Sequence, residues 1–155
     1  MFKKLTKGIK HKLTLCQNRN IIIILTTCQK EKKQEYTSDD IDYSNDNCRA
    51  NKEMKDKNAR PEIANDLSKV DSCDKVYIGY PIWWGTAPRI IQTFLEKYNL
   101  EGKKIYTFCT SGGSGVEQSI SDLKGYFAKL DIVKGYRFDG DASEENISRG
   151  LEELK

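Results

Sequence analysis

The sequence predicts an α/β protein built on a doubly wound parallel sheet. From Arg60 onward, apolar runs of strand length alternate with segments whose apolar residues recur at helical spacing. The run Lys104–Thr110 is too apolar for a sheet with one wet face, so helices are expected on both faces. With 155 residues, the chain is the size of one domain.

Four apolar segments are expected to be strands, of which the third should be central. They are Ile21–Thr27, Lys75–Tyr80, Lys104–Thr110 and Ile132–Phe138. Residues 30–58 are dense in Lys, Asp and Asn without a sustained apolar period, and they are expected to form a long loop.

Helix-start signals precede four further segments. Pro61 predicts a helix near residues 61–69, and Thr86 with Pro88 in the first turn predicts a second helix. Ser114 and Glu117 have the spacing of a capping box for a third. Ser143, followed by two glutamates, predicts a last helix through Leu154.

Charge and reactive residues exclude several function classes. Residues 1–34 hold nine Lys/Arg and one acid, and this leader is best explained as a solvated tail rather than a nucleic-acid-binding arm. The five cysteines form no Cys-x-x-Cys pair, which favours a reducing cytoplasm over a disulfide framework or zinc site. The single histidine, His11, leaves no basis for a histidine triad or a histidine metal cluster.

The N-terminal apolar run does not predict a transmembrane segment. Ile21–Leu25 with the next two threonines spans seven residues, against roughly 20 for a bilayer. Leu25-Thr26-Thr27-Cys28 is loosely similar to a lipoprotein cleavage box, but Thr27 stands where a smaller residue is usual, so a cytoplasmic location is preferred to anchoring at Cys28.

Two unusual loops follow neighbouring predicted strands. In Tyr80–Gly85, the adjacent Trp83 and Trp84 leave a strand inside a turn, where at least one ring should be exposed. A planar conjugated ligand would explain such exposure, although packing of one ring and edge placement of the other explains it equally well.

The second loop, Thr110–Gly115, has three glycines in four positions before a predicted helix. Bare backbone amides could approach a flat or anionic ligand there, but ordinary tight turns also use paired glycines. In parallel sheets, ligands bind beyond the carboxyl ends of strands, where both loops are expected.

The loops Gly79-Tyr80-Pro81-Ile82-Trp83-Trp84-Gly85-Thr86-Ala87-Pro88 and Cys109-Thr110-Ser111-Gly112-Gly113-Ser114-Gly115 closely resemble those of a bacterial branch of flavodoxin-like proteins. The stretch Tyr36–Pro61 is similar to that branch too, so the resemblance covers about the last 120 residues. It implies an FMN-binding fold with five parallel strands in the order 2-1-3-4-5.

The resemblance also implies which residues bind FMN. One side of the isoalloxazine would be flanked by Pro81, Ile82, Trp83, Trp84 and Gly85. The other side and the polar edge would be lined by Thr110, Ser111, Gly112, Gly113 and Gly115.

The N-terminal part departs from the family pattern. Flavodoxins begin with a strand and a Ser/Thr/Gly-rich loop that wraps the FMN phosphate, whereas Ile21–Leu25 is followed by a stretch without glycine. Ile21–Leu25 can be the first or the second family strand, but not both. We therefore expect an N-terminally incomplete domain at residues 35–155, behind an atypical leader at 1–34.

Three functions are compatible with this pattern. The first is electron transfer through FMN to a redox partner protein or a small-molecule acceptor, with weak binding because the phosphate loop is missing. This function does not clearly require a catalytic acid or base of the chain. The second is an NAD(P)H:quinone-type FMN oxidoreductase, and the third is a truncated non-catalytic remnant.

Overall fold

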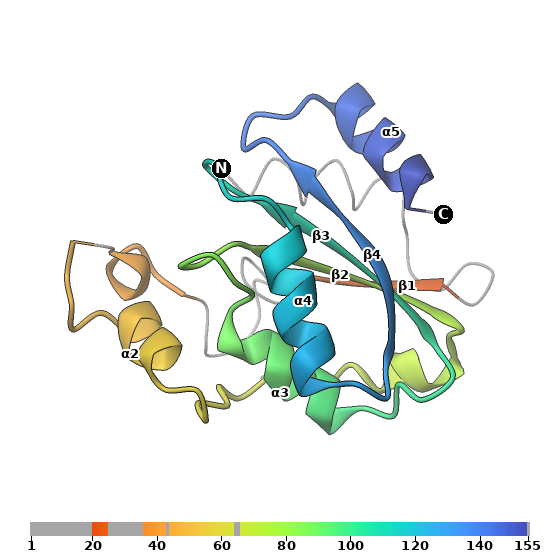
Figure 1. The fold of residues 1–155 in the computed structure, drawn as a ribbon, viewed down its shortest axis with the longest axis horizontal. Helices are drawn as coiled ribbons and strands as arrows, with labels where there is room; N and C mark the ends of the chain where they lie inside the picture. The colour runs from red at the N-terminus through yellow and green to blue at the C-terminus, as the bar shows by residue number, and fades with distance from the viewer. Residues whose placement is uncertain (1–19, 25–35, 43, 64–65, 155) are drawn as a thin grey trace.

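The computed structural model describes residues 20–24, 36–42, 44–63 and 66–154 (Figure 1). Four strands form one sheet in the order β1-β2-β3-β4, and every neighbouring pair is parallel. The strands are β1 (Asn20–Ile24), β2 (Lys75–Pro81), β3 (Lys104–Thr110) and β4 (Asp131–Phe138). The predicted α/β parallel sheet is confirmed, with β3 between two partners as expected.

The position of β1 resolves the alternative left open by the sequence. Ile22 pairs with Tyr77 and Ile24 with Gly79, so β1 lies directly beside β2. In the family order 2-1-3-4-5, the first strand lies beside the third strand, and β2 of this structure corresponds to that third family strand. β1 therefore occupies the place of the first family strand, and within the described residues the sheet has four strands rather than five.

Side chains of β2 and β3 alternate between two cores, as the period of a strand requires. Val76, Ile78 and Ile105 face a core shared with helices α3 (Arg89–Lys97) and α4 (Glu117–Tyr126). Tyr77 and Tyr106 face a second core with α5 (Glu144–Glu153). The sheet is thus covered on both faces, and α3 and α4 lie together on one side (Figure 1).

Close packing explains one glycine in the middle of β2. A Cβ on Gly79 would overlap the ring of Phe108, which lies on β3 directly opposite and is completely buried. Phe108 therefore uses the space that a side chain at residue 79 would need, and this keeps β2 and β3 in register beneath their two loops.

The predicted helix near residues 61–69 is wrong over the residues described. Residues 61–63 are not helical, residue 64 lies outside the described ranges, and the segment instead forms the short 3₁₀ helix η2 (Ser68–Ser72). Only Val70 of η2 is buried, so the apolar spacing that suggested a longer helix is not used as one face.

The predicted long loop at residues 30–58 contains more structure than expected. It includes the 3₁₀ helix η1 (Asp39–Ile41) and the α-helix α2 (Arg49–Lys55), which lie apart from the sheet (Figure 1). Cys48 caps α2, since its Sγ accepts the Asn51 N–H at 3.4 Å. The sequence did not predict α2 because the helix buries only Ala50 and Asn51 and has no apolar stripe.

Candidate functional site

The two unusual loops meet at the carboxyl edge of the sheet. Pro81 and Thr110, the last residues of β2 and β3, are paired in register. One residue further, the Ile82 N–H donates to the Thr110 carbonyl at 2.9 Å, so the ladder continues into both loops. The structure therefore brings the two predicted halves of the site together.

The first loop reverses direction in a tight turn around Trp84 and Gly85. Trp83 and Thr86 exchange both backbone hydrogen bonds at 3.0 Å. Trp84 has φ +46° and Gly85 φ +82°, the two positive values that a type I′ turn requires. A positive φ is unfavourable for a bulky residue, so this turn holds Trp84 in a conformation that few tryptophans adopt.

The turn separates the two tryptophans. Trp83 is 3% exposed and packs with Cys48 and Ala50, whereas Trp84 is 47% exposed. Their ring centroids are 6.5 Å apart and the planes are nearly perpendicular, at 82°. The expectation that at least one ring is exposed is confirmed, and Trp84 is that ring.

The second loop is open where glycines replace side chains. No atom lies within 4 Å of a Cβ built on Gly112 or Gly113, and both residues are exposed. Thr110 is buried at the base of the loop, and the Gly113 N–H donates to Ser111 Oγ at 3.1 Å. The loop thus presents an accessible backbone above an ordered base.

The predicted capping box in this loop is wrong. Helix α4 begins at Glu117, its N-cap is Val116, and no side chain caps it. Ser114 is therefore three residues before the helix and belongs to the exposed loop. Thr86 likewise does not cap α3, which begins at Arg89 with Pro88 at the N-cap.

Arg137 of β4 supplies the positive charge nearest the glycine loop among the described contacts. Its Nη1 donates to the Ser111 carbonyl at 3.4 Å, and its Nη2 pairs with Asp139 at 2.6 Å. Arg137 was not identified from the sequence, and no local motif distinguishes it; only the pairing of β3 and β4, with Arg137 opposite Cys109, brings it within reach of the Ser111 carbonyl.

The cysteine at the end of β3 is not an activated thiol. Burial raises the pKa of Cys109 to about 12, and the nearby Arg137 only partly opposes this shift. Cys109 is therefore protonated at neutral pH, and its thiol is a poor nucleophile.

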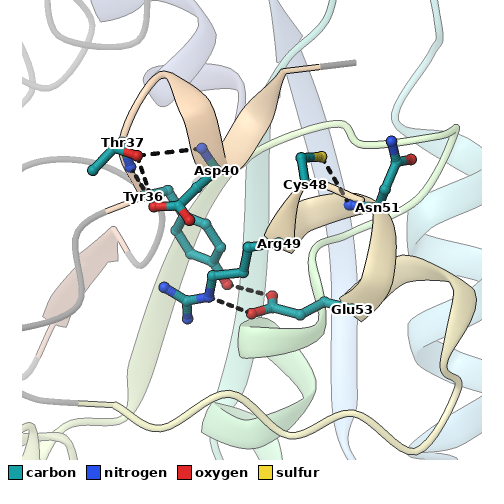
Figure 2. Close-up of polar contacts among 7 residues, drawn as sticks. All are labelled: Tyr36, Thr37, Asp40, Cys48, Arg49, Asn51 and Glu53. Carbon is teal, nitrogen blue, oxygen red and sulfur yellow. Dashed lines mark hydrogen bonds and ion pairs between the residues drawn. The ribbon is translucent and has the colours of Figure 1, made fainter. Parts of the chain in front are cut away.

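A polar and aromatic cluster is formed by Tyr36 and residues of α2 (Figure 2), and Tyr36 of this cluster contacts Trp83 of the first loop. The Tyr36 hydroxyl donates to Glu53 Oε2 at 2.5 Å, and Arg49 Nε pairs with Glu53 Oε1 at 2.7 Å. Burial and the Glu53 carboxylate both raise the pKa of Tyr36, which stays protonated. The one sequence signal for this cluster is the i,i+4 pair Arg49 and Glu53, which by itself is typical of any exposed helix.

Neither a metal cluster nor a membrane helix is found in the described ranges. No three His, Cys, Asp or Glu side chains there come together as metal ligands would. None of the helices in those ranges is long and apolar enough to cross a bilayer. The possible anchoring residue Cys28 lies outside the described residues.

Known structures share this architecture and, in part, this sequence. A protein described as a predicted flavoprotein from Bacteroides eggerthii DSM 20697 is 40% identical, with a TM-score of 0.70 over 78% of this chain and 76% of that one. A second, from Bacteroides uniformis ATCC 8492, is 34% identical, with a TM-score of 0.71 over 77% and 76%. A flavoprotein of Lactobacillus acidophilus NCFM in complex with FMN has a TM-score of 0.58 over 98% of this chain and 89% of its own, but at 17% identity it supports the fold alone.

Curated relatives are more distant. The chain is 27% identical over 119 residues to the FMN-dependent NADH:quinone oxidoreductase 2 of Halalkalibacterium halodurans, and 27% identical over 117 residues to the FMN-dependent NADH:quinone oxidoreductase 4 of Bacillus cereus. The matches cover 57% and 56% of these relatives, so the chain spans little more than half their length.

A model of a flavodoxin family matches residues 7–154, which is nearly the whole chain and includes much of the basic leader. Together with the parallel sheet and the two structural relatives above 30% identity, this match establishes that the chain belongs to the flavodoxin family.

Proposed function

We propose that this protein binds FMN at the carboxyl edge of β2 and β3 and acts in electron transfer. The observation that carries the proposal is the pairing of an exposed aromatic ring, Trp84, with the open glycine backbone of the adjoining loop. The Ile82–Thr110 hydrogen bond joins the bases of the two loops that carry these surfaces.

The residues present fit the ring of FMN. An indole face offers offset stacking to a conjugated ring, and glycines let backbone amides approach its polar edge. Within the described residues, the Gly112 and Gly115 N–H groups have no hydrogen-bond partner, so they are available donors. Bound FMN would supply the redox chemistry, while the chain would hold the ring and control its surroundings.

The ten site residues contribute unequally in this proposal. Pro81, Ile82 and Thr110 form the ordered base, and Trp84 with Gly112 and Gly113 form the exposed surface. Trp83 would support the turn rather than offer an exposed ring to FMN, because its ring is almost wholly buried. Gly85 allows the turn, and Ser111 and Gly115 flank the glycine pair.

The sequence lacks the Ser/Thr/Gly-rich loop that wraps the FMN phosphate in flavodoxins, and the residues that directly follow β1 lie outside the described ranges. The proposal therefore keeps the prediction of a weak site, since each lost charge-assisted bond costs about 1.5–3 kcal/mol. It also keeps residues 1–34 as an atypical leader, residues 35–155 as the domain that carries the site, and a cytoplasmic location.

Replacing Trp84 tests the site directly. In Trp84→Ala, the dissociation constant for FMN should rise about tenfold, because a stacked ring contributes about 1.4 kcal/mol of binding free energy. FMN fluorescence quenching during titration measures this. Tyr126→Ala is the matched control, since Tyr126 is 49% exposed and lies at the C-terminal end of α4, away from the glycine loop. Equal affinity in wild type and Trp84→Ala would contradict the proposed site.

A second function is favoured by the curated relatives, which are named as FMN-dependent NADH:quinone oxidoreductases. The same FMN site would then accept hydride from NADH and reduce a quinone. Steady-state oxidation of NADH in the presence of a quinone separates this enzyme from a carrier, which exchanges electrons only with its partner.

A further inference from the structure

Tyr36 lies outside both loops, yet its contacts lead to the exposed ring of the site. We propose that Tyr36 is a positioning residue for the FMN site, which acts through Trp83 to fix the orientation of Trp84. The inference rests on the proposed function, because Trp84 is taken as the ring that stacks on the flavin.

Two contacts, from a paired Glu53 and Arg49, hold the Tyr36 ring in one place (Figure 2). Its hydroxyl donates to Glu53 at 2.5 Å, and the same carboxylate is paired with Arg49. The Arg49 guanidinium also lies 4.2 Å from the centroid of the Tyr36 ring. A hydrogen bond at one end and a cation over the face restrict both the tilt and the translation of the ring.

The fixed Tyr36 ring in turn restricts the movement of the Trp83 ring. The two rings meet edge to face, with centroids 4.9 Å apart and planes at 83°. Cys48 and Ala50, at the start of α2, are buried in the same cluster as Trp83, and Ile41 and Met54 pack against it. Since Trp83 is 3% exposed, its ring can move only if this cluster moves.

The turn then couples Trp83 to Trp84. Trp83 is bonded twice to Thr86 across the turn, and Trp84 stands at φ +46° between them. A bulky residue stays in this region of backbone space only when its surroundings impose it. The packed Trp83 is one such constraint, and its loss would weaken the hold on the conformation of Trp84.

Arg89 anchors the far end of α2 to the same loop. This buried residue begins α3 and donates to the Met54 carbonyl at 3.0 Å and the Glu53 carbonyl at 3.4 Å. The segment from Trp83 to Arg89 is therefore held at both ends by α2 and its flanking Tyr36. Through these contacts α2 supports the loop and limits its movement.

Two variants separate the ring of Tyr36 from its hydroxyl. In Tyr36→Ala, the dissociation constant for FMN should rise about fivefold, because the edge-to-face contact is lost. In Tyr36→Phe, which keeps the ring but breaks the bond to Glu53, the rise should be about twofold. Tyr126→Ala and Tyr126→Phe are the matched controls at an exposed tyrosine far from the loops, and both should bind as wild type does.

A second measurement reads the tryptophans without FMN. The chain contains only two tryptophans, so labelling with 5-fluorotryptophan gives two ¹⁹F resonances, of which Trp84 is assigned by its loss in Trp84→Phe. In apo Tyr36→Ala, the Trp84 resonance should shift toward the free amino acid and change width. The Trp83 resonance should gain a solvent-isotope shift as its ring becomes accessible.

The outcomes distinguish the inference from the function on which it rests. If wild type does not bind FMN, the proposed function fails, and the ¹⁹F spectra still decide whether Tyr36 positions Trp84. Unchanged FMN affinity together with an unchanged Trp84 resonance in both Tyr36 variants would overturn the inference. Should Tyr36→Ala not fold, Tyr36→Phe and Glu53→Gln test the same contact, and wild-type values in both would also overturn it.

Discussion

Tyr80 is the largest side chain that is completely buried in the described core, and it carries a polar group with it. Its hydroxyl lies 3.0 Å from Ser119 Oγ, which also lies 2.8 Å from the Val116 carbonyl. Either hydroxyl can be the donor in the Tyr80–Ser119 pair. Burial raises the pKa of Tyr80 to about 12, because the charged phenolate is poorly solvated beneath α4, although the Ser119 hydroxyl partly favours it.

This raised pKa predicts a specific pH dependence of stability. Between its ordinary value of 10.0 and about 12, the unfolded chain loses the tyrosine proton while the folded chain keeps it. The contribution of Tyr80 is thus fully present below pH 10 and is lost as the pH rises toward 12. In Tyr80→Phe, the free energy of unfolding should be about 1 kcal/mol lower than wild type at pH 8, from the lost hydrogen bond.

The difference in unfolding free energy between wild type and Tyr80→Phe should narrow by about 1 kcal/mol by pH 11, because only the folded wild type must keep this proton bound. Urea unfolding at pH 8, 9, 10 and 11, followed by circular dichroism, measures both curves. Tyr36 and Cys109 also have raised pKa values, but they are present in both proteins and cancel in the difference. Parallel curves would contradict this account of Tyr80.

At the scale of elements, two serines that look alike in the sequence have different roles. Ser143 caps α5, because its Oγ accepts the Asn146 N–H at 3.2 Å, whereas Ser114 caps nothing. Ser143→Ala should lower the free energy of unfolding by about 1 kcal/mol. Ser114→Ala is the matched control and should leave it unchanged. Thermal or urea unfolding measures both, and an equal loss in the two variants would refute the assignment of caps.

The contrast shows which elements a sequence can reveal. The strands β2, β3 and β4 and the helix α5 were predicted to within a residue or two, because each has an apolar run or a stripe with a clear start. Thr86 and Ser114 have the right residue type for a cap, but the loops that contain them continue past the signal to form the site. At these two positions the tertiary structure of the site loops overrides the local capping signal.

α2 was missed for a different reason. Its contribution to the fold comes from neighbours far away in the sequence, chiefly Trp83 and Arg89, and not from an apolar face of its own. The candidate site divides in the same way. The two loops were visible in the sequence as unusual composition, whereas the burial of Trp83, the exposure of Trp84 and the position of Arg137 depend on register and packing.

At the scale of the whole molecule, the sheet joins two cores that lie on opposite faces. The core under α3 and α4 and the core under α5 both draw on β2 and β3, so a disturbance of either strand reaches both layers. β2 can serve both cores only while its own edges are paired, with β3 on one side and β1 on the other. β1 lies within the basic leader, so this pairing determines whether the leader contributes to folding.

Two neighbouring proline substitutions test that contribution. In a parallel strand, alternate residues turn their N–H toward a given neighbour, so of Ile22 and Ile23 only one can donate to β2. Ile22→Pro and Ile23→Pro should therefore differ, with one variant losing about 3 kcal/mol of unfolding free energy and the other much less.

Glu144→Pro is the matched control, because it places proline at the first position of α5, where no helical hydrogen bond is lost, after a residue with ψ 161° that suits it. Urea unfolding with a single probe for the whole sheet, such as circular dichroism, gives the three values. If neither β1 variant is less stable than the Glu144→Pro control, β1 is not part of the cooperative fold, and the domain begins after the leader as the sequence predicted. A loss of stability in only one of the two isoleucine variants would instead show that β1 pairs with β2 and contributes to folding as the first strand of the flavodoxin sheet.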